Sequence, residues 1–106
     1  MRTYKQGDTI RRAVKLAYKG TGDPVDLSEC TAQSQLRTYP AEKLMAEGKV
    51  SIDVPHGLVW ALYTPEQTAA LQPGEYGYDI RMKTQGDVIT LLTTRIKICK
   101  AYTEME

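Results

Sequence analysis

The sequence has 106 residues, 42% of them hydrophobic and 25% charged, with a formal net charge of +1. This length supports one hydrophobic core, so we expect a single domain over residues 1–106. The balance of 14 Lys and Arg against 13 Asp and Glu argues against nucleic acid as a partner. The longest apolar run, residues 58–63, is far below the ~20 residues that cross a bilayer, so we expect no membrane partner either.

Residue types that support catalysis or metal binding are scarce. The chain has two cysteines, Cys30 and Cys99, and one histidine, His56, all far apart, whereas a structural zinc site needs about four such ligands. We expect both cysteines to be reduced and partly buried, with a disulfide as the alternative if their strands are neighbours. We expect His56 to be exposed in a turn. The sequence has no phosphate-binding or calcium-binding loop, so it predicts no enzyme activity, metal or cofactor.

The first half of the chain predicts strands separated by turns. Residues 9–18 alternate between apolar and charged side chains, as in a strand with one buried face. The side chains expected to face inward are Ile10, Val14, Leu16 and Tyr18. A Gly- and Pro-rich turn at residues 20–24 precedes a second strand at about residues 31–39. Residues 41–48 have no clear period and are expected to form a loop.

Two further strands are predicted at residues 49–54 and 58–63, and the latter is apolar on both faces. A sandwich buries only one face of each strand, so the second apolar row needs cover. We expect Leu58, Trp60 and Leu62 to form this row and to be a candidate protein interface. Cover by residues 41–48 of the chain itself is the alternative.

The strongest local signal begins at Thr64, which suits a helix N-cap. Pro65 fits the first helical position and Gln67 the return bond of a capping box. The sequence predicts a short helix at about residues 65–71, held by packing of Leu71.

The remaining chain predicts a hairpin. Residues 75–84 alternate, with Tyr76, Tyr78, Ile80 and Met82 expected to face inward, and residues 85–87 form the turn. The last strand, at about residues 88–100, is expected to place one set of side chains on a common face. This set is Thr90, Leu92, Thr94, Ile96 and Ile98. About six strands and one short helix predict an all-β sandwich.

Antibody-type domains fit this sequence poorly. Trp60 lies too far after Cys30, and Lys97 stands two residues before Cys99, where a tyrosine corner would be expected.

Four segments together resemble a known family. They are the Gln-Gly-Asp-Thr sequence at 6–9, Pro-Val-Asp-Leu-Ser at 24–28, Leu-Arg at 36–37 and the long block 63–80. In this order they are similar to the small immunoglobulin-like domains of tailed-phage virion proteins, the type found at the amino terminus of baseplate upper proteins. The resemblance spans nearly the whole chain. It implies an immunoglobulin-like antiparallel β-sandwich and a structural role with no catalytic residues, and we expect a free-standing subunit.

We therefore expect a phage or prophage structural protein that acts through protein–protein contacts. It would belong to the tail, baseplate or neck, or decorate the capsid. Its expected partners are itself, as a homo-oligomer, and other virion proteins, and it would be made in the host cytoplasm and reside in the virion. The alternative is a carbohydrate-binding module that recognises host surface polysaccharide through Trp60 and surface tyrosines.

Overall fold

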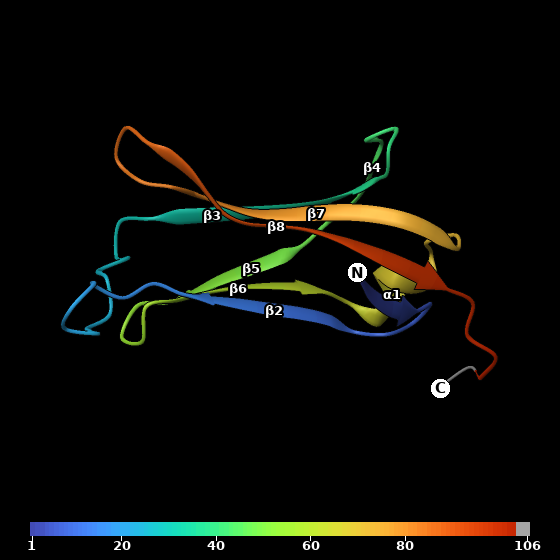
Figure 1. Cartoon of the computed structure of the whole chain (residues 1–106), viewed down its shortest axis with the longest axis horizontal. Coiled ribbons are helices and arrows are strands. Elements are labelled where there is room, and N and C mark those ends of the chain that lie inside the picture. Colours follow the sequence, from blue (N-terminus) through green and yellow to red (C-terminus); the bar gives the residue numbers. More distant parts are fainter. Residues whose placement is uncertain (104–106) are drawn as a thin grey trace.

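The structure is a computed structural model that describes residues 1–103. These residues form two facing β-sheets and one short helix at one end (Figure 1). One sheet has five strands in the order β1-β8-β7-β3-β4, and the other has three in the order β2-β6-β5. The elements are β1 (Arg2–Lys5), β2 (Ile10–Lys15), β3 (Thr31–Thr38), β4 (Leu44–Glu47), β5 (Lys49–Asp53), β6 (Leu58–Tyr63), α1 (Pro65–Ala69), β7 (Gly74–Lys83) and β8 (Val88–Cys99).

The strand order is that of an immunoglobulin-like sandwich. In such domains strands B, E and D form one sheet, while C, F and G form the other. Here β2, β6 and β5 take the first three places, and β3, β7 and β8 take the second three. The short β4 extends the larger sheet beside β3, and β1 runs parallel to β8, with Arg2 opposite Ile96. The predicted all-β sandwich is confirmed.

The core between the sheets divides into two clusters. The helix-end cluster lies next to α1, and the loop-end cluster lies towards the opposite end of the sandwich (Figure 1). The helix-end cluster contains Ile10, Leu36, Tyr63, Leu71, Tyr76, Tyr78, Ile96 and Ile98. The loop-end cluster contains Leu27, Val59, Ala61, Ile80 and Met82. The inward orientation predicted for the four apolar residues of β7 is confirmed, because all four are buried.

The helix begins as predicted. The Thr64 side chain accepts a hydrogen bond from the Gln67 backbone N–H, and the Gln67 side chain accepts one from the Thr64 N–H, which completes a capping box. The helix ends at Ala69, two residues before the predicted end, because Ala70 already serves as its C-cap. Leu71 follows outside the helix and is buried in the helix-end cluster, as predicted.

Two strands were not foreseen. The described chain has eight strands, not about six, and the additional ones are the four-residue edge strands β1 and β4. The predicted loop at residues 41–48 is wrong because β4 lies there. The pairing of β4 with β3 contains a bulge: Ala46 lies opposite Leu36, and Leu44 lies opposite Arg37, the next residue of β3. Met45, between them, has no partner in β3. This bulge removes the alternation by which a strand is recognised in a sequence.

Two predicted orientations are also wrong. Tyr18 is 55% exposed, because β2 ends at Lys15 and the chain has left the sheet. On β8 a second bulge, opposite the step from Ile80 to Arg81, reverses the faces of the residues before Leu92. Leu91 therefore packs against the loop-end cluster, whereas Thr90 is exposed. The predicted face holds from Leu92 to Ile98.

A tyrosine corner is present, but it does not lie two residues before Cys99. The Tyr76 hydroxyl, near the start of β7, donates a 2.6 Å hydrogen bond to the Gln72 carbonyl four residues upstream. This is the bond that defines the corner at the start of strand F. Position 97 does not correspond to the corner of antibody domains, because Cys99 ends β8, the strand that follows strand F in this fold.

Candidate protein interface

Strand β6 carries the candidate interface. One of its faces is buried in the core, and the other lies on the surface of the molecule. Val59, Ala61 and Tyr63 point into the core and are at most 1% exposed. The alternate residues Leu58, Trp60 and Leu62 lie on the outer face of the three-stranded sheet and remain partly exposed. We call these three residues the β6 row. The structure thus places the three predicted residues side by side on one surface.

The neighbouring strands place small and charged residues beside the β6 row. Residues directly opposite each other in an antiparallel pair share a face. Trp60 lies between Ala13 of β2 and Ser51 of β5. Leu62 lies between Arg11 and Lys49. At the other end Leu58 lies between Lys15 and Asp53. The row is therefore an apolar stripe with small neighbours at its centre and charges at its ends.

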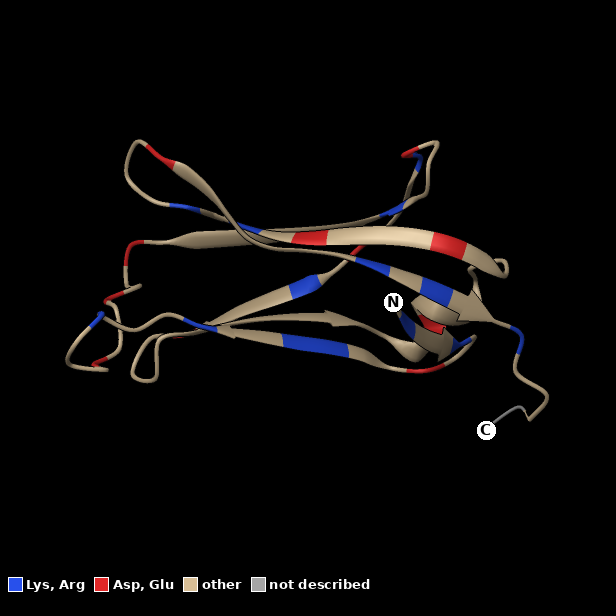
Figure 2. Ribbon diagram, viewed as in Figure 1, with Lys and Arg blue, Asp and Glu red and all other residues tan. Residues whose placement is uncertain are grey.

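The charges around the β6 row are mostly positive. Figure 2 shows Lys and Arg along β2 and on β5. Arg11, Lys15 and Lys49 are exposed and lie on the same face as the β6 row. Asp53 is the acid on this face, and its carboxylate contacts His56 Nδ1 at 2.9 Å. If this face met the same face of a second copy, similar cations would come together. Its charge therefore fits a partner that brings carboxylates.

The chain does not cover the β6 row with residues 41–48. That segment contains β4, which pairs with β3 in the opposite sheet, so the proposed cover is wrong. The outer face is instead hollowed beside the row, in a groove lined by Arg11, Lys49, Ser51, Trp60 and Leu62 together with the backbone of the strands.

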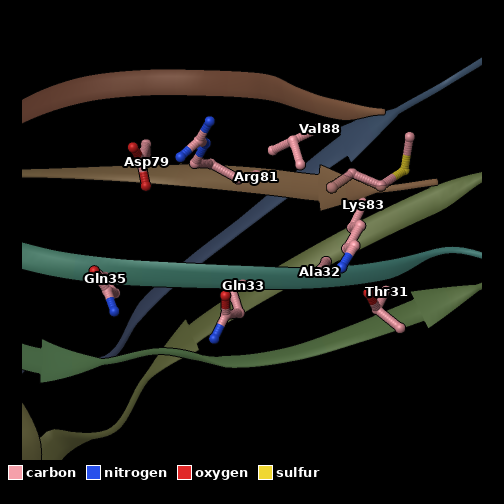
Figure 3. Close-up of a pocket in the computed structure, with 9 residues that line it drawn as sticks. Thr31, Ala32, Gln33, Gln35, Asp79, Arg81, Lys83 and Val88 are labelled. Carbon is pink, nitrogen blue, oxygen red and sulfur yellow. The ribbon is translucent and has the colours of Figure 1, made fainter. Parts of the chain in front are cut away.

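The outer face of the five-stranded sheet has a contrasting surface. A hollow there is lined by polar and charged residues of β3 and β7, including Gln33, Gln35, Asp79 and Arg81, together with Ala32, Met82 and Val88 (Figure 3). Neighbouring polar groups bond to one another: Arg37 donates to the Gln35 amide oxygen at 2.9 Å. This face resembles an ordinary solvated surface and has no row of large apolar residues like that on β6.

The buried tyrosines are structural. The Tyr63 hydroxyl lies 2.7 Å from Ser34 Oγ, which donates to the Asp79 carbonyl at 2.6 Å. Burial raises the pKa of Tyr63 to about 12, although the Ser34 hydrogen bond opposes the shift. Burial also raises the pKa of Tyr76 and of Tyr78. These hydroxyls therefore stay protonated near neutral pH and serve as hydrogen-bonding groups.

The remaining reactive residues lie apart from one another. His56 is 72% exposed, as expected for a turn residue. Cys30 and Cys99 are both free and partly buried, and Cys30 packs against the loop-end cluster. Within residues 1–103 no group of three or more His, Cys, Asp or Glu could hold a metal ion. No helix in that part of the chain is long and apolar enough to span a membrane.

A scan against protein-family models and a search of curated proteins each find no match to this chain.

Proposed function

We propose that this chain is a structural protein of a bacteriophage or prophage particle and acts through protein–protein contacts. It would be a component of the tail, baseplate or neck, or a decoration of the capsid. The β6 row is the observation that carries the proposal, because its three large apolar side chains lie partly exposed on one sheet face. The motif order of the sequence supports the phage context, and the sandwich is the fold that this resemblance implies.

The contact through the β6 row is made with another virion protein. The three side chains still expose part of their apolar surface, and burying it against a partner contributes about 25 cal/mol for each Å² removed from water. A central Trp is also among the residues that most often dominate the binding energy of an interface. The cations Arg11, Lys15 and Lys49 around the row favour a partner surface that carries acidic residues at its rim.

Quantitative mass spectrometry of purified particles from the source phage tests the proposal. We expect the protein in the particle at a reproducible copy number. A number that matches tail symmetry supports a tail, baseplate or neck component, and a number near that of the major capsid subunit supports a decoration. Absence from the particle contradicts the proposal.

A pair of matched variants tests the role of the β6 row. Trp60→Asp removes the central aromatic residue and should reduce incorporation into particles by about thirtyfold, the effect of losing about 2 kcal/mol of contact energy. Gln33→Asp places the same side chain on the exposed outer face of β3 and should leave incorporation unchanged. Circular dichroism confirms that both variants are folded. Equal incorporation of the two variants would show that the β6 row is not the contact surface.

The carbohydrate-binding alternative rests on Trp60, whose small neighbours Ala13 and Ser51 leave room beside its ring. Sugar sites favour stacked aromatic residues, whereas leucines flank Trp60 on β6. The sequence contains one tryptophan, so its fluorescence reports this position alone. A saturable change on titration with host polysaccharide would favour the alternative; no change supports the assembly role.

A further inference from the structure

The two sheets leave four edge strands, and three of them carry features that discourage pairing with another chain. Strand β4 has a bulge at Met45, β2 points the charged Arg12 towards the interior, and β1 is four residues long with charged ends. Strand β5 is also short and has charged ends, but these two charges are of opposite sign, and the strand has neither a bulge nor a charged side chain directed inwards. Its register with β6 is regular, and its inward residues, Val50 and Ile52, are apolar and partly buried.

The hydrogen-bonding pattern identifies the backbone groups at the free edge of β5. The Leu16 N–H donates to the Gly57 carbonyl, so the odd-numbered residues along β6 bond to β2. The even-numbered residues of β6 therefore bond to β5, where their partners are Lys49, Ser51 and Asp53. The N–H and C=O groups of Val50 and Ile52 consequently face outwards from the sheet.

The sequence of β5, Lys-Val-Ser-Ile-Asp, is complementary to itself when it runs antiparallel. With Ser51 opposite Ser51 of a second copy, Val50 lies opposite the second copy's Ile52. Both of these residues have free backbone groups, so this register forms four hydrogen bonds. In the same register Lys49 lies opposite the second copy's Asp53, and the symmetric pair repeats the contact. Moving the register by two residues in either direction keeps the hydrogen bonds but separates Lys49 from Asp53.

We propose that two copies of this chain pair antiparallel along β5 about a two-fold axis at Ser51. The paired three-stranded sheets become one six-stranded sheet, and Val50 and Ile52 gain apolar neighbours on the core side. This self-association surface goes beyond the proposed function, which concerns the β6 row. The dimer places both β6 rows on one outer face, three strand spacings or about 14 Å apart.

The contact is small compared with the roughly 1,200 Å² of a stable interface, so association depends on concentration. Sedimentation velocity of the wild-type chain at rising concentration should show a monomer–dimer equilibrium. A monomer at all concentrations contradicts the proposal.

Charge reversal tests the register directly. Lys49→Asp or Asp53→Lys alone places like charges opposite each other in two symmetric positions and should weaken self-association more than about tenfold. A mixture of the two single variants restores both opposite-charge pairs and should form a heterodimer. The double variant Lys49→Asp/Asp53→Lys should self-associate like the wild type. Unchanged self-association of the single variants, or no dimer in the mixture, overturns the proposal.

Hydrogen exchange provides a readout that needs no substitution. The amides of Val50 and Ile52 should exchange fast in dilute protein and slowly at high concentration, while those of Lys49 and Ser51 are protected throughout. Uniform behaviour of all four amides contradicts the pairing.

Trp60→Asp separates this proposal from the proposed function. We expect it to leave dimerisation intact while it reduces incorporation into particles. If Trp60→Asp abolishes self-association and the charge reversals do not, the copies meet through the β6 row and the β5 proposal fails. Loss of incorporation in the charge-reversal variants with dimerisation unchanged would also contradict it.

Discussion

The helix end and the loop end of the sandwich are held together in different ways. The helix end combines apolar packing with buried polar contacts. Ser34 and Thr68 are the buried polar residues of the described chain; Ser34 bonds to Tyr63 of the helix-end cluster, and Thr68 lies in α1. The Thr68 hydroxyl donates to the Asp8 carbonyl at 2.7 Å and accepts from the Gly7 N–H at 3.1 Å. It thereby fixes α1 to the connection between β1 and β2.

The loop end depends on apolar packing and backbone hydrogen bonds. Its cluster is made of aliphatic side chains and Met82. Its loops are joined by backbone bonds, such as that from Val25 N–H to the Leu16 carbonyl, and by an exposed side-chain bond from Gln85 to Glu29. Aliphatic packing tolerates substitutions of similar volume, whereas a buried hydroxyl has partners that few side chains can replace. We therefore expect the helix end to be the less tolerant of small changes.

Thr68→Val should have the largest effect. Valine keeps the shape of threonine at a position that is 0% exposed, but it removes the hydroxyl that bonds to the Gly7 N–H and the Asp8 carbonyl. Losing these two partly buried hydrogen bonds costs about 2–3 kcal/mol of the free energy of unfolding. Denaturant unfolding measures the loss.

Thr68→Ser is the matched control. Serine retains the hydroxyl and loses one methyl group, so its cost should be about 1 kcal/mol. If valine were tolerated better than serine at this position, the polar contact would not be what holds the helix end.

Gly48→Ala should have an intermediate effect. A Cβ at Gly48 would lie 3.0 Å from Tyr63 Cζ and 3.2 Å from Ser34 Cβ, so the Ser34–Tyr63 pair must shift. Overpacking of this kind costs about 1–3 kcal/mol. At Gly77 the nearest atom to an added Cβ is the Thr94 carbonyl oxygen at 3.6 Å, an ordinary contact. Gly77→Ala should therefore leave the thermal midpoint almost unchanged, and equal losses in both variants would contradict a tightly packed helix end.

The sequence predicts those parts of the fold whose signal is local. The capping box at Thr64 lies within four residues, and the two rows of β6 follow from an uninterrupted alternation. Strand β4 is missed because its bulge at Met45 breaks the period. The contacts of Thr68 could not be foreseen, because Asp8 is 60 residues away in the sequence.

The candidate interface is also only partly visible in the sequence. The β6 row can be identified from its spacing, but its basic surroundings depend on the registers that place Arg11 and Lys49 beside Leu62. The charge symmetry of residues 49–53 is likewise visible in the sequence. Its significance depends on β5 being an edge strand, which only the topology shows. Tyr76 is predicted as a core residue, but its bond to Gln72 requires the observed turn.

The smallest expected difference between the two ends is in how stability depends on alkaline pH. Tyr63 has a pKa of about 12 in the fold, against 10.0 for an ordinary tyrosine, because burial disfavours the charged form. Above pH 10.0 the unfolded chain loses a proton that folded Tyr63 retains, so rising pH favours unfolding. This contribution to stability is complete below pH 10.0 and is lost as the pH approaches about 12.

The decline for one retained proton is at most about 1.4 kcal/mol per pH unit. Tyr63→Phe removes this group and should give a shallower decline of the urea midpoint with pH, while Tyr76 and Tyr78 still contribute. The comparison between wild type and variant cancels those shared contributions. The loop-end cluster contains no tyrosine, so the extra loss in the wild type reports the helix end. If the urea midpoints of the two proteins fell in parallel with pH, burial of the Tyr63 hydroxyl would not contribute to the stability of the helix end.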